Sequence, residues 1–178
     1  MKITKLIAVA AASAMAMASQ SAMAADNATA DVTVTLVDAL DVTKATDLRF
    51  GTIIKPKTAN STIYMGANDT RVVQSGDAVL QTSTFGLASF TVSGATGAAY
   101  NATIVGTSGS ANGVTLKAVN GVCTAGTLSG TGLNGTMTGC TSYGAGGLKV
   151  GGIIEITPTS TASGAVTVGT VKVTLAYQ

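Results

Sequence analysis

The sequence TVKVTLAY, at residues 170–177, alternates apolar and polar side chains almost to the last residue of the chain. Period-two alternation is typical of a β-strand that has one face on a core and the other in solvent. We therefore predict a long final strand over residues 166–177. Its core-facing side chains would be those of Val171, Val173, Leu175 and Tyr177.

A second alternating stretch, ATADVTVTL, lies near the other end of the chain, at residues 28–36. The same rule predicts a half-buried strand there. One face carries only small or apolar residues, namely Ala28, Ala30, Val32, Val34 and Leu36. We call these five residues the N-terminal stripe.

Between the two stretches, short segments rich in Thr, Val and Ile are separated by turn-forming residues. We predict strands at residues 40–42, 48–54, 61–65, 70–74, 78–81, 88–92, 99–105, 114–119 and 148–157. Ser75-Gly76-Asp77 indicates a hairpin, Asn112-Gly113 a tight turn, and Gly151-Gly152 a bulge or close backbone approach. The Gly-rich residues 120–147 are expected to form a loop. About ten short strands without helical periodicity favour an all-β sandwich.

The first 24 residues have the features of a Sec signal peptide. Lys2 and Lys5 precede an apolar run over residues 6–18, and Ser21-Ala22-Met23-Ala24 is a small-residue cleavage pattern. An N-terminal membrane anchor is the alternative, for which the apolar run is short. We expect three segments: a signal peptide at 1–24, an extension at 25–37 and a domain at 38–178.

The charged residues limit the classes of function. The chain has ten basic residues, eight acidic residues and no His. Without Lys2 and Lys5 the formal charge is zero, which argues against nucleic-acid binding. Because His is the commonest general base and metal ligand, its absence predicts a protein that is not an enzyme. We expect no catalytic, cofactor-binding or metal-binding residues.

Two cysteines, Cys123 and Cys140, lie in the Gly-rich segment. An even number of cysteines in an exported protein indicates a disulfide. A disulfide between them would close a loop of 18 residues, counting both cysteines. Closing this loop would stabilise the fold by about 3 kcal/mol on the chain-entropy estimate. A redox or metal-binding pair is the alternative, and it lacks the Cys-x-x-Cys spacing and the His that such sites use.

The C-terminal residues resemble those of chaperone–usher pilus subunits. That family has a Gly about fourteen residues from the end, an apolar alternation and a penultimate aromatic residue. Here these are Gly164, then Val171, Val173 and Leu175, and Tyr177. DLRFGTI at 47–53 is similar to an early-strand element of the archaic branch. ASFTVSG at 88–94, followed by GAAY at 97–100, resembles a fimbria-like family of exported domains of unknown function. The typical pilin disulfide joins early strands, whereas both cysteines here lie in the second half.

The resemblance implies a fold and a function. In such subunits an immunoglobulin-like sandwich lacks its final strand, and a periplasmic chaperone fills the resulting groove. The N-terminal extension of the next subunit then replaces the chaperone strand. The N-terminal stripe would be that donor strand, and Gly164 with the final strand would form the groove and chaperone motif. The partners would be further copies of the chain, the chaperone and an outer-membrane usher, and the protein would pass through the periplasm to a surface fimbrium.

Two alternatives remain open at this point. The N-terminal stripe is also compatible with the first strand of its own sandwich. The whole protein is then a self-contained secreted surface or adhesive domain that does not polymerise.

Overall fold

The computed structural model describes residues 28–66, 68–124, 126–128 and 132–178. The expected signal peptide, residues 1–24, therefore lies outside the described residues. The chain divides into two units, Met1–Thr35 and Leu36–Gln178. Every strand of the described residues lies in the second unit, and these residues contain no helix. Accordingly, the described part has no helix long and apolar enough to cross a membrane.

The larger sheet is built around β12 (Gly144–Ile156), the longest strand of the chain. One edge of β12 pairs first with β6 (Ala88–Ser93) and then with β3 (Ser61–Met65), and its other edge pairs with β9 (Val114–Cys123). The remaining strands extend this sheet: β1 (Asp41–Thr46) on β6, β4 (Arg71–Ser75) on β3, and both β8 (Ser110–Ala111) and β10 (Gly126–Leu128) on β9.

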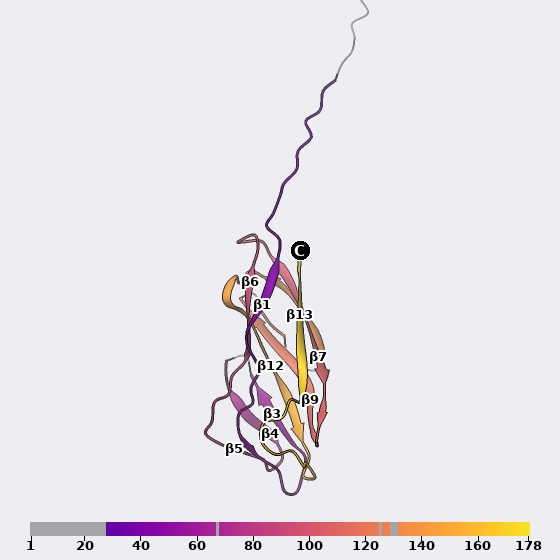
Figure 1. Cartoon of the computed structure of the whole chain (residues 1–178). Helices are drawn as coiled ribbons and strands as arrows, with labels where there is room; N and C mark the ends of the chain where they lie inside the picture. The colour runs from indigo at the N-terminus through magenta and orange to yellow at the C-terminus, as the bar shows by residue number, and fades with distance from the viewer. Residues whose placement is uncertain (1–27, 67, 125, 129–131) are drawn as a thin grey trace, which may run out of the picture. The chain divides into compact units, whose positions relative to one another are not determined.

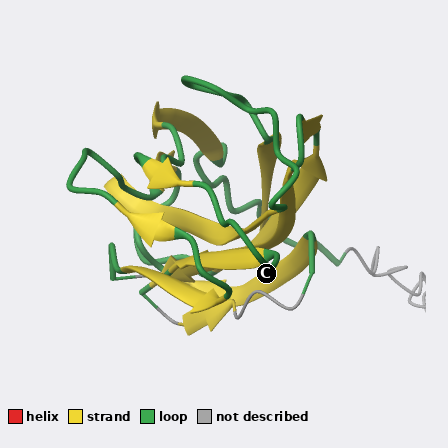
Figure 2. Ribbon diagram, turned by 90° about the horizontal axis from the view of Figure 1, so that it is seen from below, coloured by secondary structure: helices red, strands yellow, loops and turns green. Residues whose placement is uncertain are grey.

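The smaller sheet has three antiparallel strands in the order β11-β7-β13. They are β11 (Asn134–Cys140), β7 (Tyr100–Ser108) and β13 (Gly169–Tyr177). A separate pair joins β2 (Ile53–Ile54) to β5 (Val79–Leu80). The two main sheets lie in separate layers (Figure 2), with β7 and β13 in one and β12 and β6 in the other (Figure 1).

The core lies between these two sheets. Ile104 on β7 and Met137 on β11 face Gly121 on β9, where a Cβ atom would come within 2.5 Å of the Ile104 Cδ1 atom. Tyr100, Ile63, Met65 and Leu148 are entirely buried. Side chains of both layers therefore interdigitate, as in a β-sandwich, and the all-β sandwich predicted from the sequence is confirmed.

One side of the sandwich is closed by a disulfide and by side-chain packing between the layers. Cys123 at the end of β9 is bonded to Cys140 at the end of β11, with the two Cα atoms 5.7 Å apart. Strand β10 pairs with β9, and its Leu128 side chain lies over Gly135 of β11, where a Cβ atom would overlap it. The predicted disulfide is confirmed, and it fastens the two sheets together.

The Gly-rich segment differs from the prediction. We expected residues 120–147 to form a loop, but they contain the end of β9, all of β10 and β11, and the start of β12. Glycine is generally unfavourable in strands because it has no side chain to pack. Here its small size lets neighbouring side chains lie directly over the backbone, as Leu128 does at Gly135.

The hairpin expected at Ser75-Gly76-Asp77 is also wrong. The chain does turn at Gly76, which has a φ of 87°, but β4 pairs with β3 while β5 pairs with β2. The Asp77 carboxylate accepts hydrogen bonds from the Lys57 and Thr58 amides, and the Ser61 hydroxyl accepts one from Ala78. These bonds tie the turn to residues 57–61, so the two flanking strands separate.

The other predicted turns and strands hold to different degrees. Asn112 and Gly113 both have positive φ and connect β8 to β9, which confirms the tight turn. The close backbone approach at Gly151 is confirmed. Of residues 48–54, only 53–54 form a strand, with a single bridge at Arg49. Residues 28–36 form no strand in the described structure.

Replacing Gly151 with Ala tests the close approach in the centre of the larger sheet. A Cβ atom there would overlap the carbonyl oxygen of Met65 and the side-chain oxygen of Asn120. We expect the free energy of unfolding, measured by urea denaturation, to fall by about 1–3 kcal/mol. Gly86→Ala is the matched control, since nothing lies within 4 Å of that Cβ position. Equal effects of the two substitutions would contradict the packing described.

Candidate functional site: the open edge of the C-terminal strand

Strand β13 lies at an edge of the smaller sheet. It pairs with β7 along its whole length, from Gly169 opposite Ser108 to Tyr177 opposite Tyr100, without a register shift. No other strand of the described chain pairs with β13. We call the edge of β13 that faces away from β7 the open edge. Unpaired strand edges are templates for pairing with another chain.

The hydrogen-bonding phase of β13 follows from its last bond. The amide of Gln178 donates to the carbonyl of Ala99 at 3.1 Å, directly across from it in the β7–β13 register. In an antiparallel pair, residues alternate between those that bond their partner and those that do not. Even-numbered residues of β13 therefore bond to β7. The backbone groups of Val171, Val173, Leu175 and Tyr177 point to the open edge.

The same four residues carry the inward side chains. Val171, Val173, Leu175 and Tyr177 are half-buried and pack against the core, whereas Thr170, Lys172, Thr174 and Ala176 are exposed. The sequence pattern thus predicted the inward face of β13 correctly. The odd-numbered residues of β13 therefore have two properties in common. Their apolar side chains are only partly covered, and their amides and carbonyls have no partner on β7.

Strand β1 provides the facing edge in the other layer. It pairs only with β6 among the described strands, and Leu40 and Val42 are partly buried against the core. β1 begins at the end of the sandwich where β13 finishes (Figure 1). In the described residues no strand pairing joins these two edges, so this side of the sandwich lacks the links that close the opposite side.

Tyr177 connects the two edges at one end. Its hydroxyl accepts a hydrogen bond from the Ala95 amide at 2.6 Å and donates one to the Asp38 carbonyl at 2.8 Å. Gly94 has a φ of 154°, and a Cβ atom there would overlap the Tyr177 hydroxyl oxygen. The penultimate aromatic residue thus bridges the end of β13, the β6–β7 turn and the residues ahead of β1. We call these contacts the Tyr177 bridge.

Two further tyrosines hold loops. The rings of Tyr100 and Tyr143 meet edge to face, with centroids 5.5 Å apart. Tyr100 donates to the Ser142 carbonyl at 2.8 Å, and Tyr143 donates to the Ala98 carbonyl at 2.7 Å. Desolvation raises the pKa of both phenols, with Tyr177 adding to the effect on Tyr143. No local sequence pattern indicates this pair, because 43 positions separate the two residues.

Gly164 is not part of β13, which begins five residues later, at Gly169. It is in the segment between β12 and β13, with a φ of 71° and nothing within 4 Å of its Cβ position. That left-handed backbone conformation favours glycine. Gly164 therefore permits a turn ahead of β13.

The N-terminal stripe is exposed throughout. Val32, Val34 and Leu36 have 99%, 80% and 86% of their surface exposed, and the polar residues between them are exposed as well. Both the apolar and the polar residues of this segment are therefore exposed to solvent, and the alternation of the sequence has no counterpart in burial. The prediction of a half-buried strand is not met within the described chain.

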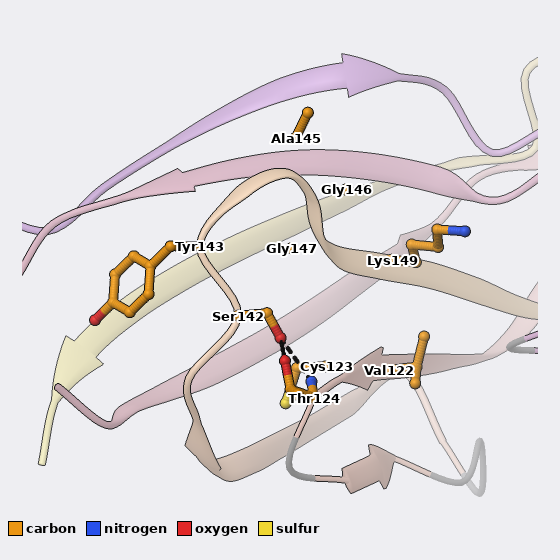
Figure 3. A pocket seen from close by; sticks show the side chains of 9 residues that line it. All are labelled: Val122, Cys123, Thr124, Ser142, Tyr143, Ala145, Gly146, Gly147 and Lys149. Atoms are coloured by element: carbon orange, nitrogen blue, oxygen red, sulfur yellow. Dashed lines mark hydrogen bonds between the residues drawn. The ribbon is translucent and has the colours of Figure 1, made fainter. Parts of the chain in front are cut away.

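A pocket of about 390 Å³ lies beside the disulfide, between the end of β9 and the start of β12 (Figure 3). Its polar side chains already have partners, inside or outside the pocket. The Ser142 hydroxyl bonds to Thr124, and Lys149, its only charged lining residue, lies 3.6 Å from Asp69. The described residues contain no group of three potential metal-ligating acids or cysteines.

Comparison with protein families gives one match. The family model for a domain of unknown function, DUF4402, matches residues 40–177. The chain belongs to the DUF4402 family. No curated protein and no solved structure matches it. The DUF4402 match begins just before β1 and ends at the last residue of β13. It includes the open edge and Tyr177, and it starts after the N-terminal stripe.

Hydrogen exchange tests the phase of β13 in the DUF4402 domain. In the unassembled chain, amides of residues 170, 172, 174 and 176 should exchange at least about tenfold more slowly than those of 171, 173, 175 and 177. Amide-resolved NMR would measure the two sets. Uniform protection of both sets would mean that another strand covers the open edge within the same chain.

Proposed function

We propose that this protein is a structural subunit of a bacterial surface fibre, in which the N-terminal stripe of one copy pairs with the open edge of another. One observation carries the proposal: the inward residues of β13 combine half-buried apolar side chains with backbone groups that point away from β7. An added strand would satisfy both requirements at once. The same chain contains an exposed segment with the required alternation.

The two segments match in length. The N-terminal stripe spans residues 28–36, which is nine residues, and β13 also has nine residues. At about 3.3 Å per residue, each would extend about 30 Å. One segment could therefore cover the other from end to end.

The side-chain sizes favour an antiparallel arrangement. This register places Ala28 opposite Tyr177, Ala30 opposite Leu175, Val32 opposite Val173, Val34 opposite Val171 and Leu36 opposite Gly169. Each large residue then meets a small one, and the medium-sized residues meet each other. The parallel arrangement would place Leu36 beside Tyr177 and Ala28 beside Gly169, so that both ends would be poorly matched in volume.

Burial supplies the driving force for this pairing. Fully burying a Val or Leu side chain contributes about 1.5–3 kcal/mol, and Val32, Val34 and Leu36 are largely exposed in the single chain. Pairing would also give partners to the backbone groups at the open edge. The formal charge of zero without the signal peptide offers little repulsion between copies.

An open edge of this kind needs protection before assembly. We propose that a periplasmic chaperone covers it first and that an outer-membrane usher directs the exchange, as the resemblance to chaperone–usher subunits implies. Export by residues 1–24 agrees with the disulfide, since disulfides persist in oxidising compartments. The proposal gives the protein a structural role in adhesion and no enzymatic activity.

Charge substitutions in the N-terminal stripe test the proposal. Val32→Asp would place an unpaired carboxylate against the core of the neighbouring copy, which costs several kcal/mol. Thr33→Asp places the same charge one residue away, on the solvent face. We expect Val32→Asp to abolish fibre assembly and Thr33→Asp to preserve it, as measured by size-exclusion chromatography and electron microscopy.

Two other outcomes would contradict the proposal. Equal assembly of both variants would mean that the N-terminal stripe faces no core. Unfolding of the isolated chain by Val32→Asp, detected by circular dichroism, would mean that the strand belongs to its own domain. The protein would then be a self-contained secreted sandwich.

A further inference from the structure

We infer that the Tyr177 bridge acts as a stop that fixes the register in which an incoming strand pairs with β13. This inference rests on the function proposed above, and it assigns Tyr177 a positioning role. The bridge crosses from the last residue of β13 to Asp38, which lies three residues ahead of β1. The bridge therefore connects the open edge of β13 to the residues ahead of β1, at one end of the sandwich.

The position of the bridge limits how far a strand can advance. An antiparallel partner would place Ala28 opposite Tyr177, so residues 25–27, which precede Ala28 in the exported chain, would have to leave the open edge at the bridge. Further movement in this direction would bring the strand against the Tyr177 side chain and the Asp38 backbone to which it is bonded. Ala95 and Gly94 hold the hydroxyl from the other side. The partner can pair with residues 169–177 and advance no further.

A stop is needed because the pattern itself tolerates a shift of two residues. Side-chain direction and backbone bonding both repeat every second residue in a strand. A two-residue advance would place Val32 opposite Leu175 and Val34 opposite Val173. All inward positions would remain apolar, and only one pair would be lost. Hydrophobic alternation therefore excludes a shift of one residue, but it discriminates only weakly against a shift of two residues.

Engineered disulfides between copies distinguish the two registers. Val32→Cys with Val173→Cys reports the expected register, and Val32→Cys with Leu175→Cys reports the two-residue advance. Directly opposite residues have Cα atoms about 5.5 Å apart, within the range for a disulfide, and diagonal residues lie beyond it. The substitutions are made in the full chain, and the products are read as ladders on non-reducing gels with mass-spectrometric mapping.

Tyr177→Phe removes both hydrogen bonds and keeps the ring. With Tyr177 present, we expect the 32–173 ladder to predominate. With Phe at this position, the yield of the 32–175 ladder should rise at least about tenfold. Gly94→Ala provides a second disruption that retains the tyrosine, because the added Cβ atom displaces its hydroxyl. The same rise is expected there, which keeps the test decisive if either variant folds poorly.

Tyr100→Phe is the matched control, since it removes a hydroxyl that bonds the Ser142 carbonyl and leaves the Tyr177 bridge in place. We expect this variant to keep the 32–173 register. A 32–173 ladder that stays predominant in both Tyr177→Phe and Gly94→Ala would overturn the stop while leaving the proposed function intact. Absence of both ladders in the chain with Tyr177 would contradict the proposed function itself, and the stop with it.

Discussion

A strand at the edge of a sheet has backbone amides and carbonyls on one side without partners, and the rest of this structure is arranged around that constraint. In β13 the residues whose backbone groups face the open edge also carry the inward apolar side chains. The same residues therefore have both unpaired backbone groups and partly exposed apolar surface. Water can hydrate the backbone, but it gives no compensation for the partly uncovered valines and leucine. The domain forms a two-layer sandwich on its own and presents an edge suited to one more strand.

The opposite side of the sandwich shows how the chain keeps its layers together. The Cys123–Cys140 disulfide joins the two sheets there, and Leu128 of β10 packs over Gly135 of β11. Glycines at the facing positions allow close approach, so a core with few aromatic residues still fills its volume. Strong links on one side leave the other side free to accept a partner without separation of the layers.

The sequence revealed those features that depend on local pattern. The alternation in residues 170–177 predicted the strand and its inward face, Asn112-Gly113 predicted a turn, and the two cysteines predicted the disulfide. The Gly-rich segment was mistaken for a loop, because its strands depend on packing against partners that are distant in sequence. The Tyr177 bridge could not be foreseen for the same reason, since Asp38 lies 139 positions away. Residues 28–36 have the pattern of a strand and form none in the described chain, because no strand of that chain pairs with them.

Solid-state NMR on mixed fibres tests the central claim most directly. Fibres would be assembled from equal amounts of copies labelled only with ¹³C and copies labelled only with ¹⁵N, so that ¹⁵N–¹³C contacts report neighbouring molecules. We predict such contacts between residues 28–36 of one copy and residues 169–177 of another, centred on the pairing of Val32 with Val173. A second sample would contain a small fraction of copies labelled with both isotopes among unlabelled copies, so that its contacts report single molecules. If contacts between the two segments appear only in this second sample, both strands belong to one chain. That result would contradict the account.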